Sequence, residues 1–486
     1  MTSNSSLPSK KALIFCLGPI ALLWPVILTL YSQKSFRFTL HGLIDWQNPL
    51  GLTSNAFNNS KIYLCRGNDC TIGRWTPRKP PHVSIDDAIK HYDGNQSNYS
   101  VWDFSYLSTG ASKEDKFVQE QYQRLINITN WIWEPNQGRM HSWNAEDFVI
   151  RMLRSSGGII FVGDSLTEHH YMFLHYLLGR AGIELDMDPP HLLHSENEMI
   201  HEWVLRPNHF MTKVLMERAG TPPSRLIRPI FTRINNPLLI GENDARPLLK
   251  NVGARDFPWI DGMAYMDGWE TYIREAATPK PGEKLATSED TVLLMNAGAH
   301  WSRKAFFMLP QNGTKEETQA RLSEVYRQMV DVITSRLSAI EDLSVYYRST
   351  SPAHPDCNLF KNPYHDSGEA RISQRDLFEQ GRSLPHRPEF GDWDWDLFGS
   401  YNLMWRQAIE ELNLKRYSQH LKGAEWFYMD IWNMTLQRPD AHTQQPGGLG
   451  PDCLHYCPAG VMEQWSYFLH HLLIERSNVW PQRGME

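Results

Sequence analysis

The chain has 486 residues, a formal net charge of −7, 41% hydrophobic residues and 21% charged residues. This length suits one large α/β domain or two smaller ones, and the hydrophobic content suits a sizeable core. The acidic balance and the lack of long Lys/Arg runs argue against nucleic acid as a partner.

The first predicted element is a membrane span at residues 12–31. Its 20 residues carry no charged side chain, and about 20 apolar residues are needed to cross a bilayer. The run is long for a cleaved signal peptide, and no small-x-small cleavage site follows it, so we expect an uncleaved anchor. We predict a cytosolic tail at 1–11, a stem at 32–60 and a lumenal catalytic domain at 61–486.

Glycosylation sequons and cysteines indicate the lumenal side. Asn-x-Ser/Thr sequons follow the predicted span at Asn58, Asn95, Asn98, Asn127, Asn312 and Asn433. Five cysteines also follow it, which fits an oxidising compartment and leaves at least one thiol unpaired. They show no zinc-ligand spacing, so no metal is expected. We predict a single-pass protein of the Golgi or secretory-pathway membrane.

Beyond residue 155, apolar strand-like runs alternate with amphipathic helix-like stretches. The predicted strands lie at 158–162, 291–296, 343–349 and 425–431. The predicted helices lie at 166–178, 316–337, 398–414 and 460–475. This alternation is typical of a three-layer α/β/α sandwich with a mostly parallel sheet. In such a sheet the active site lies at the carboxyl ends of the strands.

Ser165, in the stretch FVGDSLTEHH, follows directly on the first of these strands. It also begins the next helix, where free backbone N–H groups and the helix dipole favour a negative charge. Gly163 permits the sharp turn that presents the hydroxyl. Because Glu168 lies three residues after Ser165, the stretch also fits a plain capping box. The motif alone therefore leaves nucleophile and helix cap both open.

Two later stretches supply what a nucleophilic serine needs, a base and an orienting acid. PDCLHYCPAG carries Asp452 and His455, three residues apart in a predicted loop. Asn296 stands at the end of the strand at 291–296, and its amide is predicted to donate to an oxyanion beside the N–H of Ser165. One such donor is worth about 3 kcal/mol of barrier. Each motif alone has an ordinary structural interpretation; together they predict acyl-transfer chemistry.

As an ordered set, these stretches resemble the PC-esterase family of the SGNH/GDSL superfamily, through GDS (163–165), NAGAHW (296–301) and DCLHYC (452–457). This family contains the plant trichome-birefringence-like polysaccharide O-acetyltransferases and the catalytic domain of sialic-acid and capsule O-acetylating proteins. Further similar segments are CTIGRW (70–75), WIWEP (131–135), YYRSTSPAH (346–354) and RPDAH (438–442). The resemblance spans about residues 61–475 and implies an SGNH-hydrolase-like fold.

The resemblance implies Ser165 as nucleophile, His455 as base, Asp452 as its orienter and Asn296 in the oxyanion hole. By analogy, a further set of residues is expected to contact substrate: Asp164, His300, Trp301, Arg348 and His442. The resemblance also implies disulfide bonds between Cys357 and Cys453 and between Cys457 and either Cys65 or Cys70.

The implied activity is acetyl transfer to a glycan hydroxyl through an acyl-Ser165 intermediate. Transfer to water by the same triad would instead make the protein a carbohydrate acetylesterase. No tightly bound cofactor is expected, and acetyl-CoA or another acyl donor would be the co-substrate. The expected partners are a glycan acceptor, the membrane through residues 12–31 and a membrane protein that supplies the acetyl donor.

Two alternatives belong to other functional classes. GDWDWD (391–396) alternates like the D-x-D motif of glycosyltransferases, in which Asp392 and Asp394 would bind a metal and a nucleotide sugar. Its plainer interpretation is an acidic lead-in to the helix at 398–414, with Asp396 stabilising the N-terminus of that helix. The other alternative is a non-catalytic glycan-binding protein on a retained hydrolase fold.

Overall fold

The computed structural model describes residues 63–93, 116–192, 199–257, 268–310, 313–382, 393–444 and 451–479. The predicted tail (1–11), membrane span (12–31) and stem (32–60) lie outside these residues, as do the sequons at Asn58, Asn95, Asn98 and Asn312. Within the described stretches, no helix has the length and apolar character that crossing a bilayer requires.

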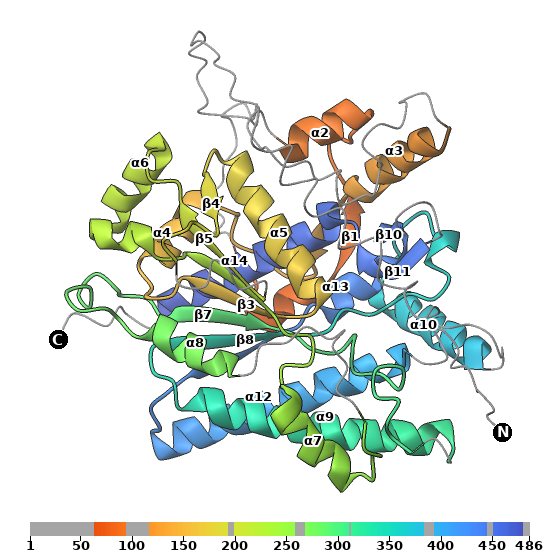
Figure 1. Cartoon of the computed structure of the whole chain (residues 1–486). Coiled ribbons are helices and arrows are strands. Elements are labelled where there is room, and N and C mark those ends of the chain that lie inside the picture. Colours follow the sequence, from red (N-terminus) through yellow and green to blue (C-terminus); the bar gives the residue numbers. More distant parts are fainter. Residues whose placement is uncertain are drawn as a thin grey trace, which may run out of the picture. The chain divides into compact units, whose positions relative to one another are not determined.

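A seven-stranded sheet with the order β4-β5-β6-β3-β7-β8-β9 forms the centre of the described fold (Figure 1). Its strands are β3 (Ile159–Gly163), β4 (Leu185–Met187), β5 (Ile200–Leu205), β6 (Phe231–Asn235), β7 (Thr291–Met295), β8 (Leu343–Arg348) and β9 (Glu425–Met429). β6, β3, β7, β8 and β9 run parallel, whereas β5 and β4 add an antiparallel edge. The predicted mostly parallel sheet is confirmed.

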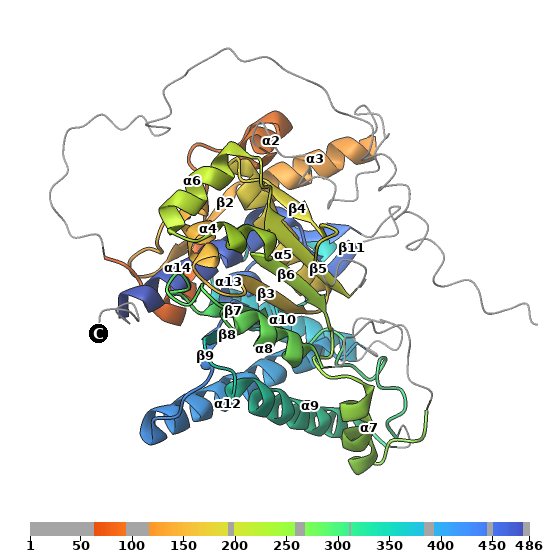
Figure 2. The same cartoon turned by 60° about the vertical axis from the view of Figure 1, so that its left-hand side comes forward.

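Helices cover both faces of this sheet. α9 (Lys315–Ser338) and α12 (Phe398–Gln419) lie together on one face, and α5 (Ser165–Arg180) and α14 (Glu463–Val479) lie on the other (Figures 1 and 2). Every residue of β3 and β7 is buried, because helices exclude water from both faces of a central parallel strand. The three-layer α/β/α prediction therefore holds for the described residues.

The remaining helices connect and flank these layers. They are α2 (Ile85–Asp93), α3 (Lys116–Thr129), α4 (Ala145–Leu153), α6 (Phe210–Ala219), α7 (Glu242–Asn251), α8 (Trp269–Ala277), α10 (Ser367–Arg382) and α13 (Trp432–Leu436). Helix starts follow local sequence signals. α9, for example, begins with a capping box in which Thr314 Oγ1 accepts from Glu317 N–H and the Glu317 carboxylate accepts from Thr314 N–H.

Two antiparallel two-stranded sheets lie outside the main sheet. β1 (Gly73–Pro77) pairs with β2 (Trp131–Pro135), and β10 (His442–Gln444) pairs with β11 (Pro451–Tyr456). The segment PDCLHY, which we predicted to be a loop, is thus a strand. Its ladder is irregular, because His442 and Thr443 pair with Tyr456 and Asp452 and leave residues 453–455 bulged. That bulge removes the alternating pattern that identifies a strand in a sequence.

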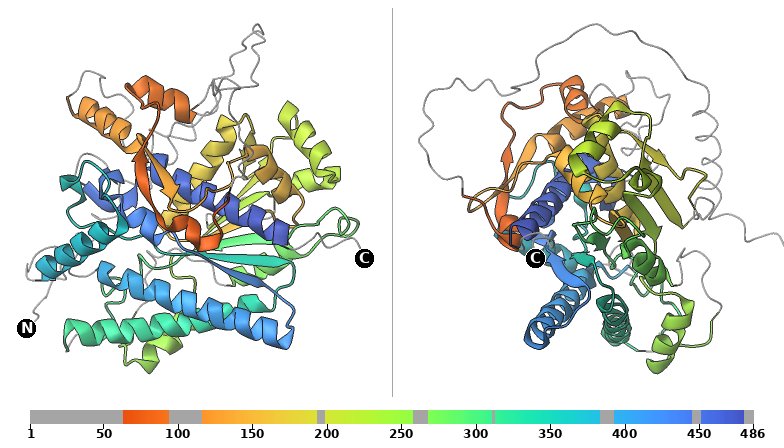
Figure 3. Two further views of the ribbon diagram at one scale, coloured as in Figure 1. Left: turned by 180° about the vertical axis from the view of Figure 1, so that it is seen from behind. Right: turned by 90° about the vertical axis from the view of Figure 1, so that its left-hand side faces the viewer.

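The described N-terminal segment is fastened to the last helix. The short 3-10 helix η1 (Gly67–Thr71) lies against α14 (Figure 3), and Gly67 N–H donates to Glu475 Oε2 over 2.8 Å. β1 follows η1 and pairs with β2, and these strands contribute Trp75 and Trp133, whose rings meet edge to face at 5.8 Å. The segments that precede the main sheet in sequence are therefore part of the same packed unit as α14.

Two disulfides tie distant and local segments. Cys357, in the 3-10 helix η4 (Cys357–Leu359), bonds to Cys453 in β11, as predicted. The predicted bond from Cys457 to Cys65 or Cys70 is wrong, since Cys65 and Cys70 bond to each other and Cys457 is a buried free thiol. The physical reason is local: the η1 turn brings the Cα atoms of Cys65 and Cys70 to 5.2 Å.

Candidate active site

Ser165, His455 and Asp452 lie in one line of contacts. Ser165 Oγ is 2.7 Å from His455 Nε2, and His455 Nδ1 is 2.8 Å from Asp452 Oδ2. Since a carboxylate only accepts, Nδ1 carries the ring proton and Nε2 accepts from the serine hydroxyl. The structure thus brings together the three residues that the sequence analysis grouped. Ser165 and His455 lie 290 positions apart in sequence.

The bulge in β11 explains how Asp452 and His455 face each other. Asp452 Oδ1 accepts from the backbone N–H groups of Leu454 and His455, at 3.1 and 3.0 Å, and this closes a turn of the chain around the carboxylate. Burial opposes ionisation of Asp452, but the hydrogen bonds from His455 outweigh it and lower its pKa to about 2. Burial alone would lower the pKa of His455, yet the contact with Asp452 raises it.

Ser165 occupies the first position of α5, immediately beyond β3. Asp164 caps the helix with its side chain, accepting from Leu166 N–H at 3.1 Å, and it is almost completely buried. A side chain at Gly163 would lie 2.6 Å from both Asn296 O and Thr167 Oγ1, so only glycine fits there. The cap of α5 is therefore Asp164 rather than Ser165, which leaves the serine hydroxyl for His455.

Asn296 does not have the geometry predicted for an oxyanion donor. Its fully buried amide donates to Thr350 Oγ1 at 2.9 Å and to Arg348 O at 3.3 Å. The amide hydrogens of Asn296 are thus used by the end of β8 and the segment that follows it. The physical reason is that residues 349–351 need hydrogen-bond partners inside the fold, which a buried asparagine at the end of β7 supplies.

Arg348, predicted to contact substrate, is instead completely buried beneath α5. Its guanidinium donates to Leu166 O at 3.3 Å and to Thr167 Oγ1 at 3.2 Å, and it lies 4.8 Å above the ring of Trp465. A group without exposed surface cannot meet a substrate. Arg348 therefore acts on the site through the first turn of α5, which carries Ser165.

The two predicted substrate contacts in NAGAHW, His300 and Trp301, differ in their exposure to solvent. Trp301 is fully buried and stacks on Phe306 at 4.8 Å, so that prediction is wrong and the indole belongs to the core. His300 remains partly exposed beside the triad. Burial lowers its pKa, the Asp164 carboxylate raises it and His455 lowers it, which puts His300 within electrostatic reach of both.

His442, the last predicted substrate contact, is also buried. Its Nδ1 lies 3.1 Å from the backbone oxygen of His455, and its Nε2 lies 2.7 Å from His354 Nδ1. The prediction of direct substrate contact is therefore wrong. His442 instead lies against the backbone of His455, because β10 pairs with β11.

Two residues near the triad, His169 and Asn235, were not predicted from the sequence. His169 lies one turn after Ser165 on α5, and its ring centroid is 5.1 Å from that of His455. Asn235 ends β6 opposite Gly163 and is half-buried. The spacing of four residues in S-L-T-E-H could have identified His169 as a neighbour on the same helix face. Asn235 could be placed near the site only once β6 was known, and β6 is hard to predict because its sequence, FTRIN, mixes apolar and polar residues.

The acidic motif of the glycosyltransferase alternative has a structural role. Asp394 is fully buried and accepts from Arg303 N–H at 2.6 Å and Arg303 Nε at 2.9 Å, while Asp396 pairs with Lys315 at 3.4 Å. Asp392 lies outside the described residues. Carboxylates already neutralised by cations are poor ligands for a metal–nucleotide sugar, so Asp394 instead anchors the chain before α12.

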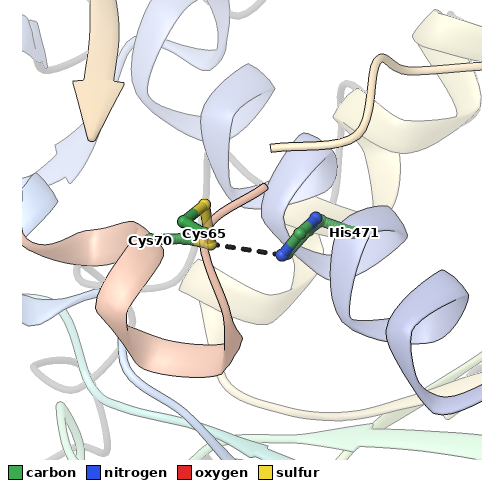
Figure 4. Close-up of side chains that lie close together, drawn as sticks. All are labelled: Cys65, Cys70 and His471. Atoms are coloured by element: carbon green, nitrogen blue, oxygen red, sulfur yellow. Dashed lines mark hydrogen bonds between the residues drawn. A yellow bond between two sulfur atoms is a disulfide. The ribbon is translucent and has the colours of Figure 1, made fainter. Parts of the chain in front are cut away.

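In the described part of the chain, one group of three metal-binding side chains gathers within 4.8 Å: Cys65, Cys70 and His471 (Figure 4). The two sulfurs form a disulfide and offer no thiolate. His471 Nδ1 accepts from His141 N–H at 3.0 Å, so its proton is on Nε2, which faces Cys70 Sγ at 3.2 Å. The arrangement is a hydrogen-bonded disulfide rather than a metal site.

Part of this site lies in a segment that matches a known protein family. Residues 280–472 match the PC-Esterase family model, described as a GDSL/SGNH-like acyl-esterase family found in Pmr5 and Cas1p. The match begins ahead of β7 and ends in α14, so it contains Asp452 and His455, whereas Ser165 lies upstream and meets them through the fold. This match supports the assignment of residues 280–472 to the PC-esterase family of GDSL/SGNH-like acyl esterases.

Proposed function

We propose that the protein transfers an acetyl group to a glycan hydroxyl through an acyl-Ser165 intermediate. Family membership supplies the reaction class, acyl-ester chemistry. The observation that supports the proposal most directly is the unbroken line of hydrogen bonds from Ser165 Oγ through His455 to Asp452. The acetyl group, the glycan and the roles of these residues are the proposed part.

In the first half-reaction, Ser165 Oγ bonds to the carbonyl carbon of the acyl donor as His455 Nε2 takes the hydroxyl proton. The oxyanion that forms lies beside the N–H of Ser165, at the N-terminus of α5, where the helix dipole favours negative charge. When the oxyanion collapses, the bond to the leaving group breaks and the leaving group receives the proton from His455. Asp452 stabilises the transient imidazolium.

In the second half-reaction, the acceptor hydroxyl gives its proton to His455 while its oxygen attacks the acyl carbon. Collapse expels Ser165 Oγ, which recovers the proton, and the acetylated acceptor leaves. Water in the place of the acceptor gives hydrolysis, so a carbohydrate acetylesterase is the second candidate. The same triad serves both reactions, and the supply of acceptor decides between them.

A glycan acceptor is supported by an aromatic edge next to the triad. The Trp393 ring lies perpendicular to His300 with centroids 6.5 Å apart, and Lys304 Nζ is 4.5 Å from the Trp393 ring centroid. Asp394 holds the neighbouring backbone through Arg303. An indole fixed in this way offers an apolar ring to the C–H face of a sugar, and Lys304 offers hydrogen bonds to its hydroxyl groups.

Trp393→Ala should therefore raise the KM for a glycan acceptor roughly ten-fold, which corresponds to the loss of one aromatic contact. The measurement is acceptor KM at saturating acyl donor. Hydrolysis of p-nitrophenyl acetate, which needs no acceptor, should change little and serves as the control. An unchanged acceptor KM would remove Trp393 from the acceptor site.

The proposal includes the cellular setting. Residues 12–31 would anchor the protein in a Golgi or secretory-pathway membrane with the catalytic domain in the lumen. The acyl donor would be acetyl-CoA or another acyl carrier, delivered with the help of a membrane protein. Protease protection of the catalytic domain in sealed membrane vesicles, lost when detergent is added, would support this topology; digestion without detergent would contradict it.

Labelling with a fluorophosphonate tests the nucleophile. The wild-type chain should form a covalent adduct whose mass maps to the peptide containing Ser165, and Ser165→Ala should abolish both the adduct and acetyl transfer. Ser418→Ala, at an exposed position near the end of α12, is the matched control and should label normally. Labelling that persists in Ser165→Ala would refute the assignment, as would normal transfer.

A further inference from the structure

His354 and His442 form a buried pair directly behind the catalytic hairpin. Their side chains are 2% and 0% exposed, and His354 Nδ1 lies 2.7 Å from His442 Nε2. At the outer ends of the pair, His354 Nε2 lies 2.9 Å from Leu436 O, and His442 Nδ1 lies 3.1 Å from His455 O. The pair thus reaches from α13 to the backbone of the catalytic base.

The two outer contacts fix the positions of two protons. A carbonyl oxygen can only accept, so His354 Nε2 and His442 Nδ1 must each carry a hydrogen. A neutral imidazole has one N–H, and both would then be used. Two neutral rings would leave His354 Nδ1 and His442 Nε2 facing each other as lone pairs at 2.7 Å. That distance is the length of a hydrogen bond and requires a third proton.

Tyr456 indicates which ring carries the additional proton. Its hydroxyl donates to Pro352 O in a short hydrogen bond, so towards His354 Nδ1, 3.2 Å away, the Tyr456 oxygen can only accept. A proton on His354 Nδ1 therefore serves both Tyr456 and His442 Nε2. A proton on His442 Nε2 would leave His354 Nδ1 without one to give to Tyr456.

We propose that His354 is a buried imidazolium that, through His442, holds the backbone oxygen of His455 and so positions the catalytic base. Neither residue touches Ser165, and both are positioning residues. The positioning role rests on the proposed function, because it concerns the placement of His455. The protonation state of the pair follows from hydrogen bonding alone and does not depend on any activity.

Charged neighbours accommodate a cation at this place. Asp440, in the 3-10 helix η6 (Pro439–Ala441), acts on His354 and is also held by Arg438 through two contacts of 2.9 Å. The charged and titratable groups that face the pair come from η6, α3 and β11, namely Asp440, Arg438, Arg124, Asp452, His455 and Tyr456. An anion thus lies close enough to offset part of the cost of burying this charge.

Opposing effects act on the pKa of His354. Burial is the largest and lowers this pKa, and the hydrogen bond to Leu436 and the charge of Asp440 offset that effect only in part. His442 Nε2 and the Tyr456 oxygen are two more acceptors for the ring protons, and hydrogen bonding to the charged form favours that form. Loss of the proton at alkaline pH would put two lone pairs in contact and displace the His455 backbone.

Histidine NMR tests the charge without any assay of activity. In the full chain labelled with 15N-histidine, two-bond 1H–15N spectra should show a ring with both nitrogens protonated at neutral pH. This signal should be missing from His354→Asn. A neutral, single-tautomer ring for His354 at neutral pH would overturn the proposal. If His354→Asn does not fold, His442→Asn provides the assignment, because it should convert the His354 signal to that of a neutral ring.

Two variants of His442 separate positioning from packing. His442→Asn can still donate to His455 O but offers no ring nitrogen to His354, whereas His442→Gln keeps an acceptor for His354 and loses the donor to His455. We expect kcat of the Gln variant to fall roughly 10- to 100-fold at unchanged KM, the effect of misplacing a catalytic group. The Asn variant should keep more activity and lose the alkaline limb of its pH profile.

The positioning role is overturned if kcat falls equally in the two variants and in proportion to their loss of thermal stability. Such a result would mean that His442 matters only as packing. If neither wild type nor variants show acyl transfer, the proposed function fails, while the NMR result still decides the protonation state of His354.

Discussion

At the scale of single residues, the site depends on where strand-end side chains point. Ser165, beyond β3, presents its hydroxyl to His455. Asn296 and Arg348, at the ends of β7 and β8, turn inward and bind the segment after β8 and the first turn of α5. The end of β3 therefore presents the Ser165 hydroxyl, while residues at the ends of β7 and β8 support the surrounding structure.

The Asp452–His455 contact makes a prediction about pH. Burial lowers the pKa of His455 but Asp452 raises it. The base must be neutral, so kcat/KM rises as pH passes the pKa of His455. Asp452→Asn removes the charge, lowers that pKa and should move the acid limb of the profile to lower pH. The plateau should fall roughly 10⁴-fold, as expected when the histidine loses its orienting carboxylate.

The measurement is a pH profile of kcat/KM for hydrolysis of a small acetyl ester. Asp331→Asn, an exposed aspartate on α9, is the matched control and should leave the profile unchanged. An acid limb that stays in place, or moves to higher pH, would show that Asp452 does not set the pKa of His455.

Asn296→Ala separates a structural role from an oxyanion role. The substitution leaves Arg348 O and Thr350 Oγ1 without their donor inside the fold, so the free energy of unfolding should fall by about 1–3 kcal/mol. At a temperature where the variant is folded, kcat should fall less than ten-fold, whereas loss of an oxyanion donor costs roughly 10²–10³-fold. Denaturant unfolding followed by tryptophan fluorescence, together with kcat, makes the comparison; a loss of kcat in the larger range would restore the oxyanion assignment.

At the scale of elements, the sequence predicted the structure where one physical rule dominates. β3, β7 and β8 are continuous apolar runs because helices cover them on both faces, and their bounds agree with prediction to within one or two residues. β6 was not predicted, because its sequence FTRIN includes polar residues; it pairs with the antiparallel strand β5. β11 was predicted to be a loop, because its bulge breaks the alternation of inward and outward side chains that marks a strand.

The candidate site also contains residues whose placement could be predicted from sequence and residues whose placement could not. The proximity of Ser165, His455 and Asp452 was predictable, because the proposed acyl-transfer chemistry needs those residue types close together. The inward orientation of Asn296, Arg348 and His442 was not predictable, because it depends on which buried backbone groups need partners. That information exists only once β8 and the β10–β11 hairpin are placed next to α5.

The two disulfides should differ in their effect. Cys357–Cys453 spans 96 residues, and Cys65–Cys70 spans 5. Chain entropy predicts that losing the long link costs about 4–5 kcal/mol of unfolding free energy and losing the short one about 2 kcal/mol. Cys357→Ser with Cys453→Ser should also lower kcat, because Cys453 lies beside Asp452.

Paired serine variants of each disulfide, compared by denaturant unfolding and by kcat, test this difference. Cys65→Ser with Cys70→Ser is the matched control, since it removes the same chemistry far from β11. Equal kcat in the two double variants would mean that the long disulfide does not support the catalytic hairpin.

At the scale of the whole molecule, the active site joins parts that are remote in sequence. His455 and Asp452, the proposed base and acid, come from the hairpin β10–β11, inside the segment that matches the family model. Ser165, the proposed nucleophile, comes from the start of α5, more than a hundred residues ahead of that segment. The sheet connects them, because β3 and β7 are neighbours and place both segments at one edge.

The same arrangement predicts catalysis without a metal ion. In the described residues, Asp394 and Asp396 are neutralised by Arg303 and Lys315, and Asp452 is paired with His455. Treatment of the purified protein with EDTA should leave hydrolysis of a small acetyl ester unchanged. A loss of activity that manganese restores would contradict the serine mechanism and favour the D-x-D alternative.

The separation of Ser165 from His455 also has a consequence for biosynthesis. A chain is made from its N-terminus, and Ser165 emerges from the ribosome 290 residues ahead of its base. Until residues 451–479 have followed, the serine has no proton acceptor and α5 lacks the cover of α14. If Ser165 is the nucleophile, as proposed, a growing chain therefore carries an inert serine until the hairpin and last helix are in place.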